Sequence, residues 1–250
     1  MNRPAAPSVS VLGVTVHAVT QDELFDFIAR AIAERRKVIV ANHNLHSVYL
    51  YHRHPAMRRY YEMAGLVHVD GMPIVYWARL RGFPLAPKHR LAYIDFLPPL
   101  LNKAAGMGWR VFYLGGKPGV AERAAEKFRV RFSSLQIETH DGYFQDDQAV
   151  LRRIRAFDPD LLLVGMGMPR QEEWVARHYD QISARVVMNC GAAFDYFAGE
   201  KATPPRWLSS LGMEWAFRLL TEPRRLARRY LVEPWLMIPI FVRDLMGGYR

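Results

Sequence analysis

Cysteine is nearly absent from this chain, because Cys190 is the only one among 250 residues. A disulfide within the chain is therefore impossible, and zinc fingers and cysteine-ligated metal clusters are excluded. Such cysteine usage is typical of proteins from a reducing compartment.

Long hydrophobic runs are absent as well. A helix that crosses a membrane needs about 18 apolar residues. The best candidate, residues 231–242, has twelve residues and contains Glu233, Pro234 and Pro239. This segment can lie on a membrane, but we do not expect it to cross one. Residues 1–10 are polar and lack the apolar centre of a secretory signal, so we expect no such signal there.

Acidic side chains are outnumbered, because 34 Lys and Arg against 24 Asp and Glu give a net charge of +10. Half of this excess lies in residues 201–250, where nine basic and four acidic side chains leave a net +5. Within residues 218–229, five arginines face Glu222 alone, which suits a solvated helix face poorly. Arginine forks bind phosphate oxygens, so this segment predicts a polyanionic partner.

Aromatic side chains are interleaved with these arginines, namely Trp207, Trp215, Trp235 and Phe241. Aromatic rings at headgroup depth and arginines on lipid phosphate are typical of an interfacial segment. The apolar content after Leu231 is too high for a nucleic-acid arm. We therefore expect an anionic membrane surface as the partner, and no nucleic acid.

The rest of the chain alternates between short apolar strands and helical segments. Half of all residues are hydrophobic, enough for a core. The expected buried strands are residues 37–41, 66–69, 110–114, 135–140, 161–164 and 185–189. Residues 9–16 alternate in polarity, apart from Leu12 and Gly13, and predict an edge strand. The alternation predicts an α/β fold with a mainly parallel sheet and helices on both faces.

Ligands of such sheets bind beyond the carboxyl ends of the strands. The turns to search are residues 42–46, 70–71, 115–119, 141–142, 165–171 and 191–195. Among them, Asp70 ends a buried strand beside Gly71, where a carboxylate can act as a general base. The alternative is that Asp70 caps the helix that begins near Pro73.

Residues 42–46, with the sequence NHNLH, combine amides and imidazoles. The amides can bind sugar hydroxyls or the edge of a uracil ring. His43 and His46 have a spacing that suits a metal, but no third ligand is evident. The favoured alternative is that Asn42 or Asn44 caps a helix and the histidines face solvent.

Residues 115–119, with the sequence GGKPG, join a strand to a helix. Such a turn can hold phosphate on free backbone N–H groups at the helix N-terminus, although it matches neither dinucleotide nor Walker fingerprints. Residues 165–167 form a similar turn, and Gln171 and Glu172 are expected to project from the first turn of the following helix.

Several short motifs, taken in order, resemble the WecG/TagA/CpsF glycosyltransferases, glycosyltransferase family 26. They are residues 158–172 (DPDLLLVGMGMPRQE), 191–199 (GAAFDYFAG), 213–218 (MEWAFR) and 222–226 (EPRRL). Asp70-Gly71, and Arg90 followed by Asp95, complete the set. The resemblance covers nearly the whole chain.

The resemblance implies an inverting glycosyltransferase that works without a metal or cofactor. It implies transfer of a hexose from a UDP-sugar to a polyprenyl-diphosphate-linked sugar, in bacterial surface or exopolysaccharide biosynthesis. The enzyme would be peripheral on the cytoplasmic face of the membrane. The implied architecture is a Rossmann-like catalytic domain, residues 1–199, and a helical membrane-associating appendage, residues 200–250.

Matched position by position, the family's base aspartate corresponds to Asp70 and its arginine before a Gly-x-Asp motif to Arg90. Its Thr-x-Asn motif corresponds to residues 42–44, with Asn42 in place of threonine. Its usual acidic residue is His46 here, which leaves the donor open among glucose, glucuronic acid and N-acetylmannosamine types. The sequence of residues 42–46 is most similar to the exopolysaccharide branch, such as the xanthan-type glucosyltransferase.

These inferences assign a candidate site with Asp70 as the catalytic residue. The expected substrate-binding residues are Asn42, Asn44, Arg90, Gly115, Gly116, Gly167, Gln171 and Asp195. The residues expected to bind the lipid diphosphate or the membrane are Arg218, Arg225 and Arg228. Without a metal, arginines and helix N-termini must stabilise the leaving UDP.

Two other classes of function stay open. A non-catalytic nucleotide-binding protein at the membrane would bind UDP without acceptor-dependent release. A nucleic-acid binder ranks last, because the α/β segment holds no basic and aromatic platform for stacking bases. Without a membrane, we expect the apolar surface of residues 207–242 to be buried in a homo-oligomer.

Overall fold

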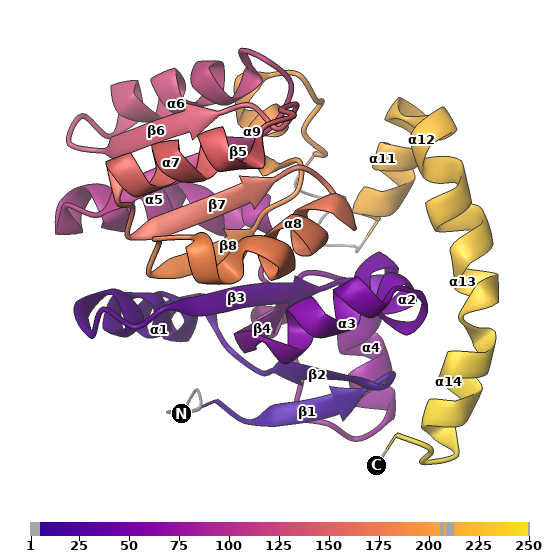
Figure 1. Ribbon diagram of the computed structural model, residues 1–250. Coiled ribbons are helices and arrows are strands. Elements are labelled where there is room, and N and C mark those ends of the chain that lie inside the picture. The colour runs from indigo at the N-terminus through magenta and orange to yellow at the C-terminus, as the bar shows by residue number, and fades with distance from the viewer. Residues whose placement is uncertain (1–5, 206–207, 209–212, 250) are drawn as a thin grey trace.

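The computed structural model describes residues 6–205, 208 and 213–249, so Trp207 lies outside the described residues. Within them, six parallel strands form a sheet in the order β4-β3-β8-β7-β5-β6 (Figure 1). The strands are β3 Val38–His43, β4 Ala64–Val69, β5 Arg110–Gly115, β6 Gln136–His140, β7 Leu161–Gly165 and β8 Val186–Asn189. The predicted α/β fold with a parallel sheet is confirmed.

Helices cover both faces of this sheet. Successive strand residues point to opposite sides, and both sides carry apolar side chains that must be buried. Leu161 and Leu163 enter one core, whereas Leu162 and Val164 enter the other. The first core is covered by α1 Gln21–Ala33, α5 Tyr93–Met107, α6 Val120–Arg131 and α9 Ala193–Ala198. The second is covered by α2 Leu45–Arg53, α3 Pro55–Glu62, α4 Met72–Leu80, α7 Asp147–Phe157 and α8 Arg170–His178. Short 3₁₀ turns are η1 Pro87–His89 and η2 Tyr179–Gln181.

The N-terminal segment differs from the single edge strand that its alternation predicts. Among the described residues, β1 Ser8–Val11 and β2 Val14–His17 pair antiparallel in a separate two-stranded sheet. The single-strand prediction is wrong because Leu12 and Gly13, with φ of 55° and 73°, reverse the chain in a two-residue turn. The φ of 73° at Gly13 favours glycine, and a Cβ there would also lie 2.9 Å from the side chains of His52 and Tyr249, which would have to move.

The C-terminal segment is helical, as predicted. It comprises α11 Glu214–Thr221, α12 Pro223–Ala227, the π-helical turn η3 Arg228–Val232, α13 Glu233–Leu236 and α14 Ile238–Leu245. In Figure 1 the strands of the parallel sheet point toward the side on which these yellow helices lie. None of the helices in the described ranges is long and apolar enough to cross a membrane.

This segment packs against the second core through α4. Met237 is completely buried there. The rings of Trp77 and Phe241 lie 4.5 Å apart between their centroids. Trp77 Nε1 also donates a hydrogen bond of 2.7 Å to Asp244 Oδ2, and Arg81 lies 3.5 Å from the same carboxylate. The C-terminal helices are therefore fixed beside α4 and the strand ends.

Candidate active site

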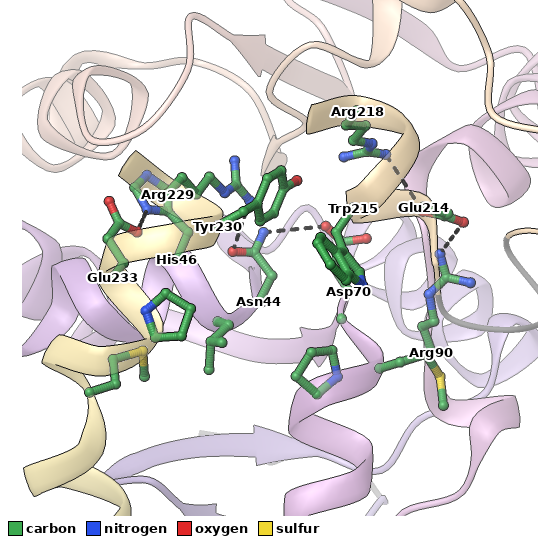
Figure 2. A pocket seen from close by; sticks show the side chains of 16 residues that line it. Asn44, His46, Asp70, Arg90, Glu214, Trp215, Arg218, Arg229, Tyr230 and Glu233 are labelled. Carbon is green, nitrogen blue, oxygen red and sulfur yellow. Dashed lines mark hydrogen bonds and ion pairs between the residues drawn. The ribbon is translucent and has the colours of Figure 1, made fainter. Parts of the chain in front are cut away.

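In the described part of the chain, three adjoining pockets lie where the strand ends meet the C-terminal helices. The Asp70 pocket, shown in Figure 2, has a volume of about 330 Å³ and lies between Asp70 and Arg229. The amide pocket, of about 470 Å³, is lined in part by Asn42, Gln171 and Asn189. The glycine-loop pocket, of about 680 Å³, follows the turns after β5, β6 and β7.

The pockets share lining residues and so form one path across the strand ends. Asp70 and Arg218 line both the Asp70 pocket and the amide pocket. Gly167 and Arg225 line both the amide pocket and the glycine-loop pocket. A ligand that occupies the glycine-loop and amide pockets would therefore reach Asp70, which lies at the junction of the amide pocket and the Asp70 pocket.

Asp70 directly follows β4, and its backbone N–H donates to the carbonyl of His43 at the end of β3. Its Oδ2 lies 3.5 Å from Asn44 Nδ2. Gly71, not Asp70, is the N-cap of α4, and no side chain caps this helix. The capping alternative for Asp70 is therefore wrong, and its carboxylate remains available for chemistry.

The surroundings of Asp70 adjust its basicity. Burial raises its pKa to about 6, while Arg218 and Arg90 oppose this shift. The carboxyl is enclosed by protein yet partly accessible from the pocket. At neutral pH it is mostly ionised and still more basic than an ordinary aspartate, which suits a general base.

Two arginines flank Asp70 and are held by one carboxylate of α11 (Figure 2). Arg90 Nη2 donates to Glu214 Oε1 at 2.6 Å, and Arg218 Nη2 lies 3.7 Å from Glu214 Oε2. The Arg218 guanidinium also lies 5.5 Å from the ring centroid of Tyr196. Its Nε is buried without a hydrogen-bond partner among the described residues. Arg218 also lines both the Asp70 pocket and the amide pocket, so its guanidinium can contact an anionic ligand there.

Asn44 lines the Asp70 pocket next to Asp70. It is the N-cap of α2, because its Oδ1 accepts from Ser47 N at 3.1 Å, as expected for one of the two asparagines. Arg229 Nη2 lies 3.5 Å from the same oxygen. Asn42 does not cap the helix. It is buried in β3, where its carbonyl accepts a 2.8 Å hydrogen bond from Tyr61.

The expectation that His43 and His46 face solvent is wrong. His43 is buried and stacks on Tyr61 with ring centroids 3.8 Å apart, and burial lowers its pKa to about 3. His46 Nδ1 lies 2.6 Å from Glu233 Oε2 of α13. The expectation failed because β3 extends to His43 and the C-terminal helices cover α2. Within the described ranges, no group of three or more His, Cys, Asp or Glu could hold a metal ion.

The glycine turns offer less free backbone than the sequence predicts. The N–H of Gly116 donates to the carbonyl of Gly165, and the N–H of Gly167 donates to Gln171 Oε1 at 3.1 Å. Gly115 is absent from the lining of these three pockets within the described residues. A Cβ at Gly115 would lie 2.4 Å from the Gly165 carbonyl oxygen, so this glycine permits close approach of β5 and β7.

Charged side chains border the glycine-loop pocket. Asp195 lies 3.5 Å from Lys201 Nζ, which lies 3.6 Å from Glu222. Glu222 in turn accepts hydrogen bonds of 2.6 and 2.8 Å from Arg225. Lys117 and Arg170 also line the pocket, so it offers cationic groups to an anionic ligand beside the paired Lys201 and Arg225. Arg228 is exposed and lines only the amide pocket among the three.

Comparison with known proteins shows the family to which the chain belongs. A sequence profile described as the glycosyl transferase WecG/TagA/CpsF family matches residues 9–250. The chain belongs to the WecG/TagA/CpsF family. It is similar to two Staphylococcus aureus proteins, from strains MRSA252 and NCTC 8325 / PS 47, both named N-acetylglucosaminyldiphosphoundecaprenol N-acetyl-beta-D-mannosaminyltransferase. Each is 30% identical over 99% of this chain and 96% of its own length.

This WecG/TagA/CpsF protein is therefore a glycosyltransferase, as the motifs predicted. Its site also contains residues that sequence reasoning did not assign. Glu214 links two arginines, and Arg229 and Glu233 contact the segment after β3. Glu172 is buried next to Gln171 of the amide pocket and does not itself line the three pockets of the described structure; burial raises its pKa to about 7. The Gln171-Glu172 pair was a usable signal, because Gln171 Nε2 donates to Glu172 Oε1 at 2.7 Å.

The acid limb of the pH–rate profile should report Asp70 in this glycosyltransferase. Because the carboxylate is the basic form, kcat/KM should rise with pH through about 6 and level off above it. Arg90 favours the ionised form, so Arg90→Met should raise the pKa of Asp70 and move the limb up by about one pH unit. Steady-state kinetics between acid and neutral pH would measure this shift. An unmoved limb in Arg90→Met would mean that another group titrates.

Proposed function

We propose that this glycosyltransferase moves a hexose from a UDP-sugar to a polyprenyl-diphosphate-linked sugar, with inversion and without a metal ion. The observation that carries the proposal is the position of Asp70, where the Asp70 pocket and the amide pocket meet between Arg90 and Arg218. A general base at the junction of two substrate pockets is the arrangement that a direct displacement needs.

The proposed reaction is one displacement at the anomeric carbon. Asp70 takes the proton of the acceptor hydroxyl as its oxygen forms the new bond to carbon. The bond from that carbon to the UDP oxygen breaks, and both its electrons leave with UDP. Arg218, at the junction of the pockets, stabilises the negative charge that develops on the leaving diphosphate.

The donor is proposed to occupy the glycine-loop and amide pockets. Lys117 and Arg225 supply cationic walls for the diphosphate, and Asn42, Asn44 and Gln171 supply amides for sugar hydroxyls. The transferred sugar is proposed to be of the glucose, glucuronic acid or N-acetylmannosamine type. Asp195, beside the glycine-loop pocket, is proposed to bind donor hydroxyls.

The acceptor is proposed to enter the Asp70 pocket, by analogy with the relatives whose names specify an undecaprenol-linked acceptor. Exposed apolar residues on the C-terminal helices, including Trp235 and Ile238, support a position on the inner membrane surface. We accordingly propose residues 1–199 as the catalytic domain and residues 200–250 as an appendage that contacts the membrane. The product would serve bacterial surface or exopolysaccharide biosynthesis.

A purified sample with a panel of UDP-sugars, with and without a polyprenyl-diphosphate-sugar, tests the proposal directly. UDP release should require both substrates and should persist in EDTA. Calorimetry on the same sample would report UDP binding independently. Binding of UDP without acceptor-dependent release from any pair would favour the non-catalytic alternative, and loss of release in EDTA would contradict the metal-independent reaction.

A further inference from the structure

The walls of the Asp70 pocket differ in polarity from one side to the other. The strand ends and α11 supply charged groups, with Asp70 and Arg218 among them. An apolar side is formed by Met72 and Pro73 at the start of α4 and by Pro234 and Met237, although Glu233 of α13 also lines the pocket, where it pairs with His46. Figure 2 shows Asp70, Glu214 and Arg218 on the charged side. A ligand with an anionic head and an apolar tail matches this division.

We propose that the polyprenyl chain of the acceptor leaves the Asp70 pocket between α4 and α13 and then follows the exposed apolar face of α4. This inference rests on the proposed function and adds a binding path in the α/β body for the lipid part of the substrate. The acceptor diphosphate would remain on the charged side of the pocket, and the first isoprene units would contact Met72, Pro73 and Pro234.

The path on α4 is a stripe of residues at helical spacing. Pro73 is exposed at the pocket edge, Tyr76 is 53% exposed one turn later, and Leu80 is 71% exposed a further turn along. Positions i, i+3 and i+7 lie on the same side of a helix. The opposite side of α4 is buried through Ile74, Val75 and Ala78, which enter the second core. The exposed side chains of Tyr76 and Leu80 thus extend the apolar side of the pocket outward along α4.

The neighbouring C-terminal helices expose apolar side chains as well. Trp235 of α13 is 71% exposed, and Ile238 at the start of α14 is 47% exposed. The buried Met237 lies between these two helices. Contact between Trp77 and Phe241 holds α14 against α4. The stripe on α4 therefore lies beside the segment proposed to contact the membrane, and a chain leaving the pocket could pass from protein to lipid with little exposure to water.

Comparison of long and short acceptors tests the path. The two probes are the same diphosphate-linked sugar on an undecaprenyl chain and on a short linear alkyl chain, assayed in one detergent. The wild-type enzyme should prefer the long chain, because more apolar surface is buried. In Tyr76→Glu and in Leu80→Glu, the ratio of kcat/KM for the long over the short acceptor should fall about tenfold.

Val130→Glu is the matched control, because Val130 is an apolar residue of α6, 88% exposed, on a helix that covers the other face of the sheet. Its ratio should equal that of the wild type. A loss of folded enzyme lowers both rates equally and cancels in the ratio, so a poorly folded variant still tests the idea. An unchanged ratio in both α4 variants would overturn the path. Absence of transfer to either acceptor by the wild type would instead contradict the proposed function.

Discussion

Asp70→Asn should lower turnover by about 10²–10⁴-fold, the usual contribution of a positioned general base. The amide has nearly the shape of the carboxylate but cannot accept the proton of the acceptor hydroxyl. Its oxygen can keep the contact with Asn44 Nδ2. Donor binding should therefore be retained, and UDP-sugar affinity measured by calorimetry should change little while acceptor-dependent UDP release collapses.

Asp180→Asn provides the matched control for this experiment. Asp180 is an exposed carboxylate in η2, before β8 and so at the opposite edge of the sheet from the pockets. The same chemical change there should leave turnover at the wild-type level. Turnover of Asp70→Asn within tenfold of the wild type would show that the proton goes to another group.

Arg218→Met should lower kcat by roughly 10²–10³-fold, as expected when one preorganised donor to a developing negative charge is removed. Methionine fills part of the space of the arginine stem but offers no N–H groups. Arg218 lines both the Asp70 pocket and the amide pocket, and its Nε has no hydrogen-bond partner among the described residues. Its loss should therefore affect the transition state more than the binding of either substrate.

Arg224→Met is the control for charge on the same segment. Arg224 is exposed on α12 and is absent from the lining of the three pockets in the described structure. Steady-state kinetics should give Arg224→Met a kcat close to that of the wild type. Equal losses in the two variants would mean that net positive charge, and not the position of Arg218, supports the reaction.

The parallel sheet could be predicted because its strands are short apolar runs followed by turn residues. Residues 161–164, for example, are Leu-Leu-Leu-Val before a glycine turn, and this pattern is typical of a strand buried on both faces. The N-terminal hairpin was missed for a local reason. Its turn uses Leu12 in a left-handed conformation, which a leucine rarely adopts, so the break in the alternation at Leu12 and Gly13 did not predict a change of direction.

The candidate site was predictable where a residue directly follows a strand, because parallel strands bring their carboxyl ends to one edge. Asp70 and Asn44 meet for this reason. The contributions of the C-terminal helices were harder to predict. Arg218, Arg225 and Arg228 do not lie on one continuous helix, because the chain breaks before Pro223 and winds as a π-helical turn at residues 228–232. These changes bring Arg229 to Asn44.

The docking of the C-terminal helices also sets the moment at which the enzyme can become active during its synthesis. Asp70 leaves the ribosome long before Glu214, Arg218 and Arg229, because proteins are made from the N-terminus. A nascent chain that already contains the sheet still lacks the groups that flank Asp70 and form half of its pocket. We therefore expect sugar transfer to begin only after the last helices have docked beside α4.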